Sequence, residues 1–300
     1  MSYPRVSAII ATYNRDAPLC SAISCVLSQD YPSNVELIVV DQSESHSDEV
    51  NAFLHNHQQR IRHLRQSEPN LPKARNSGLG VATGELILFV DDDVLMPRDA
   101  LTRLAAHHTT SEALAVSGLV VSEHSAQSCL GHGSAQYRVI TRESCTSLVE
   151  VRNSLDGLMF MLVPASAVRR VGGFDEALGR LTPTAYGEDH DFCYRLTKSN
   201  VRLFIDPSVQ ATHLDNVPGG CGSRNIDREL SVRYHMRALA YMSIKHSGCV
   251  GVRGWARILR GYVVNRASLR IGVKCLLERF VLAQQAVAEA VGFYRRFVTH

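Results

Sequence analysis

Short apolar runs of strand length alternate with helical stretches through the first ninety residues. The runs are VSAIIA (6–11), VELIVVD (35–41), IRHLRQ (61–66) and ELILFVD (85–91), and the helical stretches are 18–29, 47–59 and 71–82. Continuous apolar strands joined by helices predict βαβ units, and hence a mostly parallel central sheet with helices on both faces. We therefore expect an α/β fold.

The rest of the chain changes character near residue 217. Before that point the pattern predicts strands at 115–121, 157–164, 201–207 and 209–213, a turn at 171–178 and a helix at 187–200. The segment DNVPGGCGSR (215–224) is rich in Gly, Pro and small polar residues, which is typical of a loop. Beyond it the sequence is almost wholly helical. We predict two domains, an α/β domain over 1–217 and a helical C-terminal extension over 218–300.

Three of the predicted strands end in polar residues. ATYNR follows the first strand, DQSES the second, and three aspartates the strand that ends at residue 91. In open α/β sheets ligands bind outside the carboxyl ends of the strands. We therefore expect these three segments to meet in one crevice.

The segment ILFVDDDVLMP (87–97) places three consecutive carboxylates at the end of an apolar strand. Burying an unpaired carboxylate is costly and neighbouring carboxylates repel each other, so positive charge is expected beside them. The simpler interpretation is a strand end followed by a helix N-cap, with Asp99 capping the next helix. Three carboxylates exceed what a cap requires, which favours a cation site.

Five segments together carry a family resemblance. VSAIIATYNR, a second strand ending in Asp41, the block KARNSGLGVATGELILFVDDD, VGGFDE and GED occur in the order and spacing of family 2 glycosyltransferases. Over residues 5–215 the chain resembles these enzymes, which have the GT-A fold and invert configuration at the anomeric carbon. The resemblance implies a GT-A α/β/α sandwich with a nucleotide-sugar site.

The resemblance also implies a donor site. It assigns Thr12, Tyr13, Arg15 and Asp41 to the base, Arg75 to the base and phosphates, Asp91 and Asp92 to the ribose or to groups around the metal, and Asp93 and His213 to the metal and diphosphate. Hard oxygen ligands suit Mg²⁺ or Mn²⁺. Taken alone, Arg75 is equally a solvated helix arginine, and His213 a core or surface histidine.

The helix GEDHDFCYRL supplies the expected base. Apolar residues at helical spacing would dock it on the core and leave Glu188 and Asp189 at its start, where the helix dipole favours anions. The resemblance makes the second of this pair, Asp189, the catalytic base, and Asp191 is the alternative. Taken as an isolated acidic pair, Glu188 and Asp189 would more commonly be simple charges at a helix N-terminus. Asp156 and Gly157, with Glu188, are expected on the acceptor side.

The predicted function is inverting, metal-assisted transfer of a sugar from a nucleotide-diphosphate donor to an acceptor hydroxyl, in glycan, polysaccharide or glycolipid synthesis. A UDP-sugar is the first choice of donor, with dTDP- or GDP-sugars as alternatives, and a saccharide or lipid-linked saccharide is the acceptor. A sugar nucleotidyltransferase is the runner-up, although ATYNRDAPL lacks the glycines of its phosphate loop. A non-catalytic nucleotide-binding module would need neither the three aspartates nor the acidic helix start, and no nucleic-acid motif is evident.

The end of the chain is basic. From Arg253 onward nine Lys and Arg face two Glu, a local charge of +7, so the remainder carries −4 of the total of +3. Basic amphipathic helices bind anionic membranes, but the same pattern serves a helical cap or a homodimer surface. The eight scattered cysteines, without C-x-x-C, and the lack of a signal peptide or an apolar span favour a cytoplasmic protein, with peripheral contact at the inner membrane face as an option.

Overall fold

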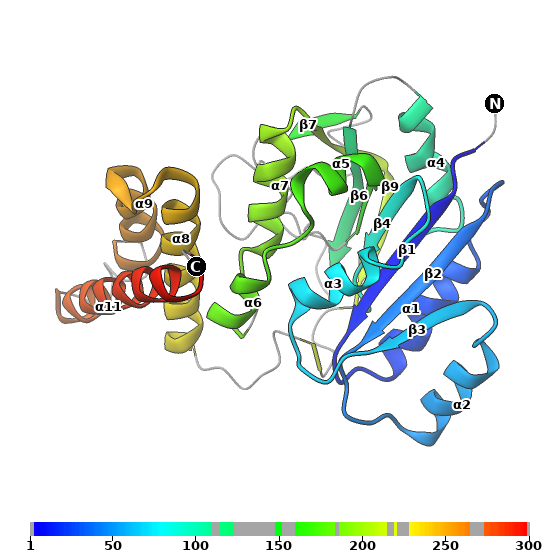
Figure 1. The fold of residues 1–300 in the computed structure, drawn as a ribbon, viewed down its shortest axis with the longest axis horizontal. Coiled ribbons are helices and arrows are strands. Elements are labelled where there is room, and N and C mark those ends of the chain that lie inside the picture. The colour runs from blue at the N-terminus through cyan, green and yellow to red at the C-terminus, as the bar shows by residue number, and fades with distance from the viewer. Residues whose placement is uncertain are drawn as a thin grey trace. The chain divides into compact units, whose positions relative to one another are not determined.

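The computed structural model divides into two compact units (Figure 1). It describes residues 3–109, 114–122, 148–151, 160–183, 186–214, 219–220, 228–264 and 273–298. Unit 1 comprises Met1–Phe174 and Asp189–Gly220, and unit 2 comprises Asp175–Glu188 and Cys221–His300. The predicted domain boundary at 217 lies outside the described residues.

Unit 1 is a sheet with helices on both faces. Its strands are β1 (Val6–Thr12), β2 (Val35–Asp41), β3 (Ile61–Arg65), β4 (Leu86–Val90), β5 (Val94–Leu95), β6 (Leu114–Ser122), β7 (Val149–Val151), β8 (Phe160–Pro164) and β9 (Arg202–His213). Its helices are α1 (Ala17–Leu27), α2 (Asp48–Asn56), α3 (Leu71–Leu79), α4 (Ala100–Ala106), the short η1 (His107–Thr109), α5 (Ala165–Val171) and α7 (Glu188–Lys198). The predicted α/β architecture is confirmed.

The sheet has the strand order β3-β2-β1-β4-β8-β6-β9-β5, with β7 paired to β9. The first four strands in this order are parallel, as predicted. Beyond them the sheet is mixed, because β8 runs antiparallel to both β4 and β6, while β6 and β9 are parallel. The apolar pattern could not reveal this reversal, since a strand covered on both faces is equally apolar in either direction.

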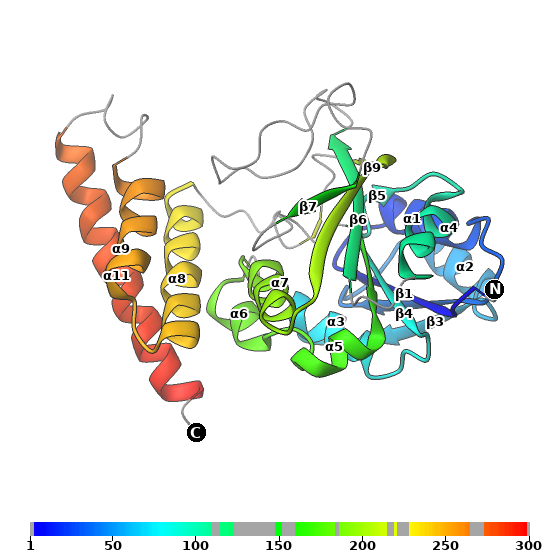
Figure 2. The ribbon, with the colours of Figure 1, turned by 90° about the horizontal axis from the view of Figure 1, so that it is seen from above.

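Alternation along each strand sends neighbouring side chains to opposite faces. In β1, Ala8 and Ile10 pack with α1, α2 and α4, whereas Ile9 packs with α3, α5 and α7. Figure 2 shows the same division of helices about the sheet. Burying one such aliphatic side chain contributes about 1.5 to 3 kcal/mol, so the two layers hold the strand ends in place.

Strand β9 differs from the sequence prediction. The two predicted pieces, 201–207 and 209–213, form one strand that passes through Pro207. Its register against β6 shifts between Gly118 and Leu119, which leaves residues 207–209 in a bulge. Proline has no N–H to donate, so a bulge is where a strand tolerates it.

The predicted turn at 171–178 lies between two short helices. Helix α5 ends at Val171, and Gly172 and Gly173 have φ of 80° and 74° before α6 begins at Glu176. These positive φ values explain the paired glycines. The flanking helices were not predicted.

Unit 2 is helical, as predicted for the C-terminal extension. Its elements are α6 (Glu176–Leu181), α8 (Arg228–Ser247), α9 (Gly251–Ile258), η3 (Leu259–Val263) and α11 (Val273–Phe297). Small side chains on α11, including Ala283, Ala286 and Ala290, are buried against the core that also holds Met236 and Tyr241 of α8. Among the described residues, no helix is sufficiently long and apolar to cross a membrane.

Candidate active site

The ends of β1 and β4 meet through their side chains. These strands are parallel neighbours, and Thr12 Oγ1 donates a 2.6 Å hydrogen bond to Asp92 Oδ2. The end of β2 joins them through the backbone, because Gln42 N donates to Thr12 O at 3.0 Å. The three polar strand ends therefore lie together at one edge of the sheet.

Two arginines and a histidine surround Asp91, Asp92 and Asp93, which we call the carboxylate triad. Arg15 Nη1 lies 2.6 Å from Asp92 Oδ1 and 2.5 Å from Asp93 Oδ2. Arg75 Nη2 lies 3.0 Å from Asp91 Oδ1, and His213 Nε2 lies 3.2 Å from Asp93 Oδ2. The positive charge expected beside the triad is thus supplied, at least in part, by the chain itself.

Strand pairing explains why His213 reaches the triad. The short strand β5 follows the triad directly and pairs antiparallel with the end of β9, so that Val94 lies opposite His213. Leu214 N then donates to Asp93 O at 2.9 Å. Residues 120 positions apart are therefore held side by side by backbone hydrogen bonds.

The Arg15 side chain packs against two glycines that follow β9, Gly219 and Gly220. Asn14 has a φ of 53° and donates from its backbone N to Ser43 Oγ at 2.8 Å, which turns the chain after β1. Gly220 N donates to Tyr13 O at 2.7 Å, and a Cβ on Gly220 would lie only 2.6 Å from Arg15 Nη2. A side chain at position 220 would displace the guanidinium, so glycine is required there.

The triad is short of positive charge. Burial raises the pKa of Asp92 to about 6, against the opposing charge of Arg15, and burial likewise raises the pKa of Asp91 against Arg75. Burial alone would also raise the pKa of Asp93, but its hydrogen bond with His213 and the charge of Arg15 hold that pKa below its ordinary value. Two of three carboxylates therefore remain harder to ionise than in water.

A second group, which we call the Asp41 cluster, lies at the end of β2. It consists of Asp41, His46, His63 and Arg65, and Asp41 is fully buried. Asp41 Oδ2 lies 2.9 Å from His46 Nε2, 3.1 Å from His63 Nε2 and 2.5 Å from Arg65 Nη1. Burial alone would raise the pKa of Asp41, but hydrogen bonds from His63, Ser43 and His46 hold it well below its ordinary value. This single carboxylate is amply compensated.

Arg75 packs on a pair of stacked aromatic rings, Phe174 and Phe192, which we call the aromatic platform. The Arg75 guanidinium lies 5.2 Å from the ring centroid of Phe174, which stacks on Phe192 of α7 at 4.3 Å. Asn76, the next residue on α3, holds the Phe174 backbone on both sides: its Nδ2 donates to Phe174 O at 2.9 Å, and its Oδ1 accepts from Phe174 N at 2.8 Å. Arg75 is therefore fixed by packing as well as by its ion pair.

Asp189 lies in the first turn of α7 and is 8% exposed. Its Oδ1 accepts from His190 N at 2.7 Å and contacts His190 Nδ1 at 2.8 Å. Burial alone would raise its pKa, but the charge and hydrogen bonds of His190 and the charge of Arg75 hold the pKa of Asp189 well below its ordinary range. Arg75 thus acts electrostatically on Asp189 while it pairs with Asp91.

The other predicted acidic residues have different surroundings. Asp191 is fully buried and pairs with Arg195 Nε at 2.8 Å on the same helix, and Arg195 Nη1 donates to Val171 O at 2.6 Å. This inward ion pair is a packing role, which argues against Asp191 as the base. Glu188 begins α7 and is 8% exposed. Asp156 and Gly157 lie outside the described residues.

The protein groups at the triad suit a divalent cation only if a bound substrate supplies further coordinating atoms. Among the described residues no three His, Cys, Asp or Glu side chains are arranged as a metal site. Asp93 and His213 nevertheless converge, and Mg²⁺ is commonly held by one or two protein groups together with substrate phosphates. Asp93 and His213 fit this mode of binding, in which substrate phosphates complete the coordination.

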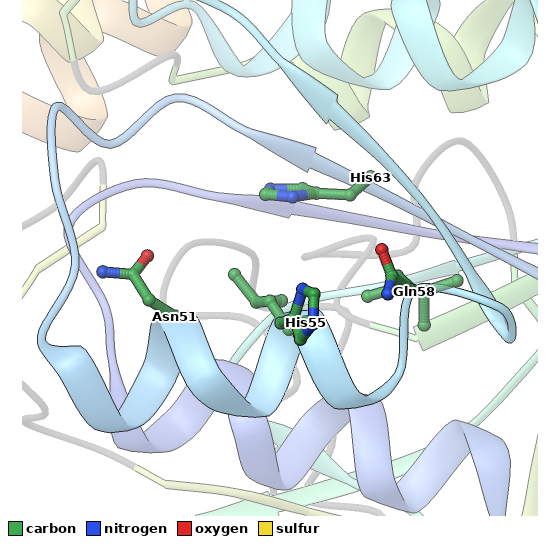
Figure 3. Close-up of a pocket in the computed structure, with 6 residues that line it drawn as sticks. Asn51, His55, Gln58 and His63 are labelled. Atoms are coloured by element: carbon green, nitrogen blue, oxygen red, sulfur yellow. The ribbon is translucent and has the colours of Figure 1, made fainter.

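Two hollows on the described surface lie away from the triad. One is lined by Asn51, Leu54, His55, Gln58, Ile61 and His63, where α2 faces β3 (Figure 3). The other is lined by residues of β7, the end of α7 and β9. Neither is lined by a triad aspartate or by Asp189.

Several residues at these sites were not anticipated from the sequence. His63 and Arg65 alternate on β3, so they share the face that meets Asp41 on the neighbouring strand. That alternation within IRHLR was a usable signal. The roles of His46 and Asn76 had no such signal, because each depends on a tertiary contact.

The fold is that of glycosyltransferases of the GT-A type. The chain belongs to glycosyl transferase family 2, whose family model, "Glycosyl transferase family 2", matches residues 7–171, more than half of the chain. The resemblance noted in the sequence is therefore confirmed.

The chain is also similar to individual glycosyltransferases, at sequence identities between 16% and 24% for those described below. An N-acetylglucosaminyltransferase of Rhizobium meliloti (strain 1021) is 24% identical over 223 residues, which are 70% of this chain and 51% of that protein. This chain therefore spans about half the length of that relative.

Two solved structures share the fold. TarS 1-349 of S. aureus, in complex with UDP-GlcNAc, has a TM-score of 0.61 at 17% identity and covers 94% of this chain and 81% of its own. The mannosyltransferase PcManGT from Pyrobaculum calidifontis, in complex with GDP-Man and Mn²⁺, has a TM-score of 0.56 at 16% identity and covers 99% of this chain and 75% of its own.

Proposed function

We propose that the chain is an inverting glycosyltransferase that moves a sugar from a nucleotide-diphosphate donor to an acceptor hydroxyl. One observation carries this proposal: Arg75 pairs with Asp91 of the triad at 3.0 Å and also lowers the pKa of Asp189. A triad carboxylate and a candidate base are therefore both within electrostatic reach of the same arginine. A nucleotide-binding module without catalysis would have no use for that arrangement.

The base is Asp189 in this proposal. As the acceptor oxygen attacks the anomeric carbon, its proton passes to an Asp189 oxygen, and the bond from that carbon to the diphosphate oxygen breaks on the opposite face. The lowered pKa keeps Asp189 ionised at neutral pH but makes it a weak base. Catalysis would then rely strongly on orientation, which supplies about 7 to 11 kcal/mol in well-aligned reactions.

The donor site is assigned to the ends of β1, β2 and β4. Thr12, Tyr13, Arg15 and the Asp41 cluster would contact the nucleoside, with Asp91 and Asp92 nearer the ribose. Asp93 and His213 would hold Mg²⁺ or Mn²⁺ together with the diphosphate, and a bound cation would stabilise the charge of the departing group. UDP-GlcNAc, present in the TarS complex, is the first donor to test, followed by GDP-Man.

The acceptor and the setting are proposed more broadly. A saccharide or lipid-linked saccharide hydroxyl would fit synthesis of a glycan, polysaccharide or glycolipid. Reduced cysteines would suit the cytoplasm, and those at 20, 25, 193, 249 and 275 are free thiols in the structure.

The test is nucleotide release from UDP-GlcNAc or GDP-Man across a panel of simple glycoside acceptors, with Mn²⁺. Asp189→Asn should lower turnover about 10²- to 10⁴-fold, the usual contribution of a general base, with UDP affinity unchanged. Asp191→Asn is the matched control, and it should lower stability rather than turnover. Full turnover in Asp189→Asn would refute the assigned base, and a product that retains the donor's anomeric configuration would refute inversion.

A further inference from the structure

One exposed helix face in unit 2 combines arginines with apolar side chains. Arg253, Arg257 and Arg260 are all exposed, and their spacings of four and three residues place them on one side of the continuous segment formed by α9 and η3. Val252, 88% exposed, and Val264, 51% exposed, lie at the two ends of this segment. We call these five residues the α9 face.

The opposite side of the same segment is anchored in the core of unit 2. Gly254, Ile258 and Val263 are buried. Arg279 Nη1 of α11 donates to Tyr262 O at 3.0 Å, which ties η3 to the neighbouring helix. The α9 face is therefore the outer side of a helix that is already packed.

Three other basic residues of unit 2 form ion pairs within that unit. Arg233 and Arg237 pair with Glu289, and Lys245 pairs with Asp175. Within the described part of the chain, Arg253, Arg257 and Arg260 form no ion pair. Their charges are available to an external partner.

Exposed apolar side chains are also concentrated in unit 2. Of the nine large hydrophobic residues that are exposed among those described, two lie in unit 1, Tyr3 and Leu148. The other seven lie in unit 2: Val252, Val264, Leu277, Phe280, Val281, Phe297 and Val298. Scattered exposed hydrophobics are ordinary, but Val252 and Val264 lie at the two ends of the segment that carries three arginines unpaired within the described residues, and this combination is the composition of a surface that lies on lipid.

We propose that the α9 face binds the surface of an anionic membrane. An isologous homodimer through this face would bring the arginines of one copy against the same arginines of the other, which like-charge repulsion opposes. An anionic bilayer offers the complementary charge, and Val252 and Val264 can enter its interfacial region. The inference does not depend on the proposed transferase activity, because binding to lipid requires neither donor nor acceptor.

The test is co-sedimentation of the full chain with vesicles of phosphatidylcholine alone or with about a third phosphatidylglycerol. Wild type should bind only the anionic vesicles and should be released by salt. R253Q/R257Q/R260Q should lower the partition coefficient about 100-fold, since each basic residue near an anionic surface contributes about fivefold. R60Q/R62Q/R98Q, which removes three exposed arginines of unit 1, is the matched control and should bind as wild type does.

A charge-conserving variant separates charge from folding. R253K/R257K/R260K should bind anionic vesicles nearly as well as wild type, whereas loss of binding in this variant would overturn an electrostatic role. Absence of wild-type binding to anionic vesicles would also overturn the proposal, as would equal binding by the glutamine variant. A wild-type dimer that the glutamine variant dissociates, measured by light scattering, would show that the face is a subunit interface instead.

Discussion

The Asp41 cluster and the carboxylate triad lie at the ends of β2 and β4, the strands on either side of β1, yet their charge balance is opposite. Asp41 is a single carboxylate with two histidines, an arginine and a backbone N–H around it, and its pKa is lowered. The triad sets three carboxylates against two arginines and one histidine, and the pKa of Asp92 rises to about 6. The carboxylate of the first site is compensated by its partners, whereas the burial of the triad is compensated only in part.

We propose that this difference separates an anchoring site from a reaction site. A compensated carboxylate keeps its neighbours in place and changes little when a ligand arrives. An undercompensated group gains most from a ligand that brings positive charge, which is how a cation and a diphosphate would bind together. The predictions below test the contrast.

The largest difference is expected when one arginine is removed from each site. Arg15→Ala should lower the free energy of unfolding by about 3 to 5 kcal/mol in chelator, because it leaves buried carboxylates without their partner. Arg65→Ala should cost at most about 1 kcal/mol, since Arg65 is half exposed and Asp41 keeps its histidines. Urea unfolding followed by circular dichroism measures both, and equal losses would remove the contrast.

A smaller effect is expected from Asp41→Asn. Because the pKa of Asp41 is lowered in the folded state, its ionised form stabilises the protein above the ordinary value of 3.8, and this contribution disappears as pH falls below that value. The variant should be less stable than wild type by about 1.5 to 3 kcal/mol at neutral pH, the range for hydrogen bonds to charged groups. The two unfolding curves should converge in strong acid. A constant difference at every pH would show that Asp41 acts by packing alone.

The smallest effect is expected at the aromatic platform on which Arg75 packs. Asn76→Ala removes both hydrogen bonds to the Phe174 backbone and should lower stability by about 1 to 2 kcal/mol, since each bond contributes about 0.5 to 1.5 kcal/mol. Asn51→Ala is the control, because Asn51 makes one exposed bond, to His46 O. Thermal unfolding compares the two variants, and an equal shift in both would deny Asn76 a special role.

Much of this arrangement could be predicted from the sequence. Apolar runs and helical periodicity predicted the first four strands and their parallel pairing, because both signals are local. The convergence of Thr12, Asp41 and Asp92 was expected because each follows the carboxyl end of a strand in an open α/β sheet. The run of three aspartates indicated a need for positive charge, although not that Arg15 and Arg75 would both supply it.

The remainder depends on contacts between distant segments. The reversal of β8 leaves no trace in an apolar run, and the bulge around Pro207 compensates for a residue that normally ends a strand. The hydrogen bond from Asn76 to Phe174, 98 positions away, depends on the turn at Gly172 and Gly173. Asp191 looked like Asp189 in the sequence, and their partners separate the two: Asp191 pairs with Arg195, whereas Asp189 contacts His190.

The central claim is that the triad, rather than the Asp41 cluster, accepts a cation together with a diphosphate. Calorimetric titration of UDP and GDP, with and without Mn²⁺, into wild type, Asp93→Asn and Asp41→Asn tests it most directly. We expect Mn²⁺ to strengthen binding of one nucleotide to wild type, and Asp93→Asn to weaken that metal-dependent binding by about 10- to 100-fold or more. Asp41→Asn should keep the response to Mn²⁺. Nucleotide binding that ignores both Mn²⁺ and Asp93→Asn would contradict the account.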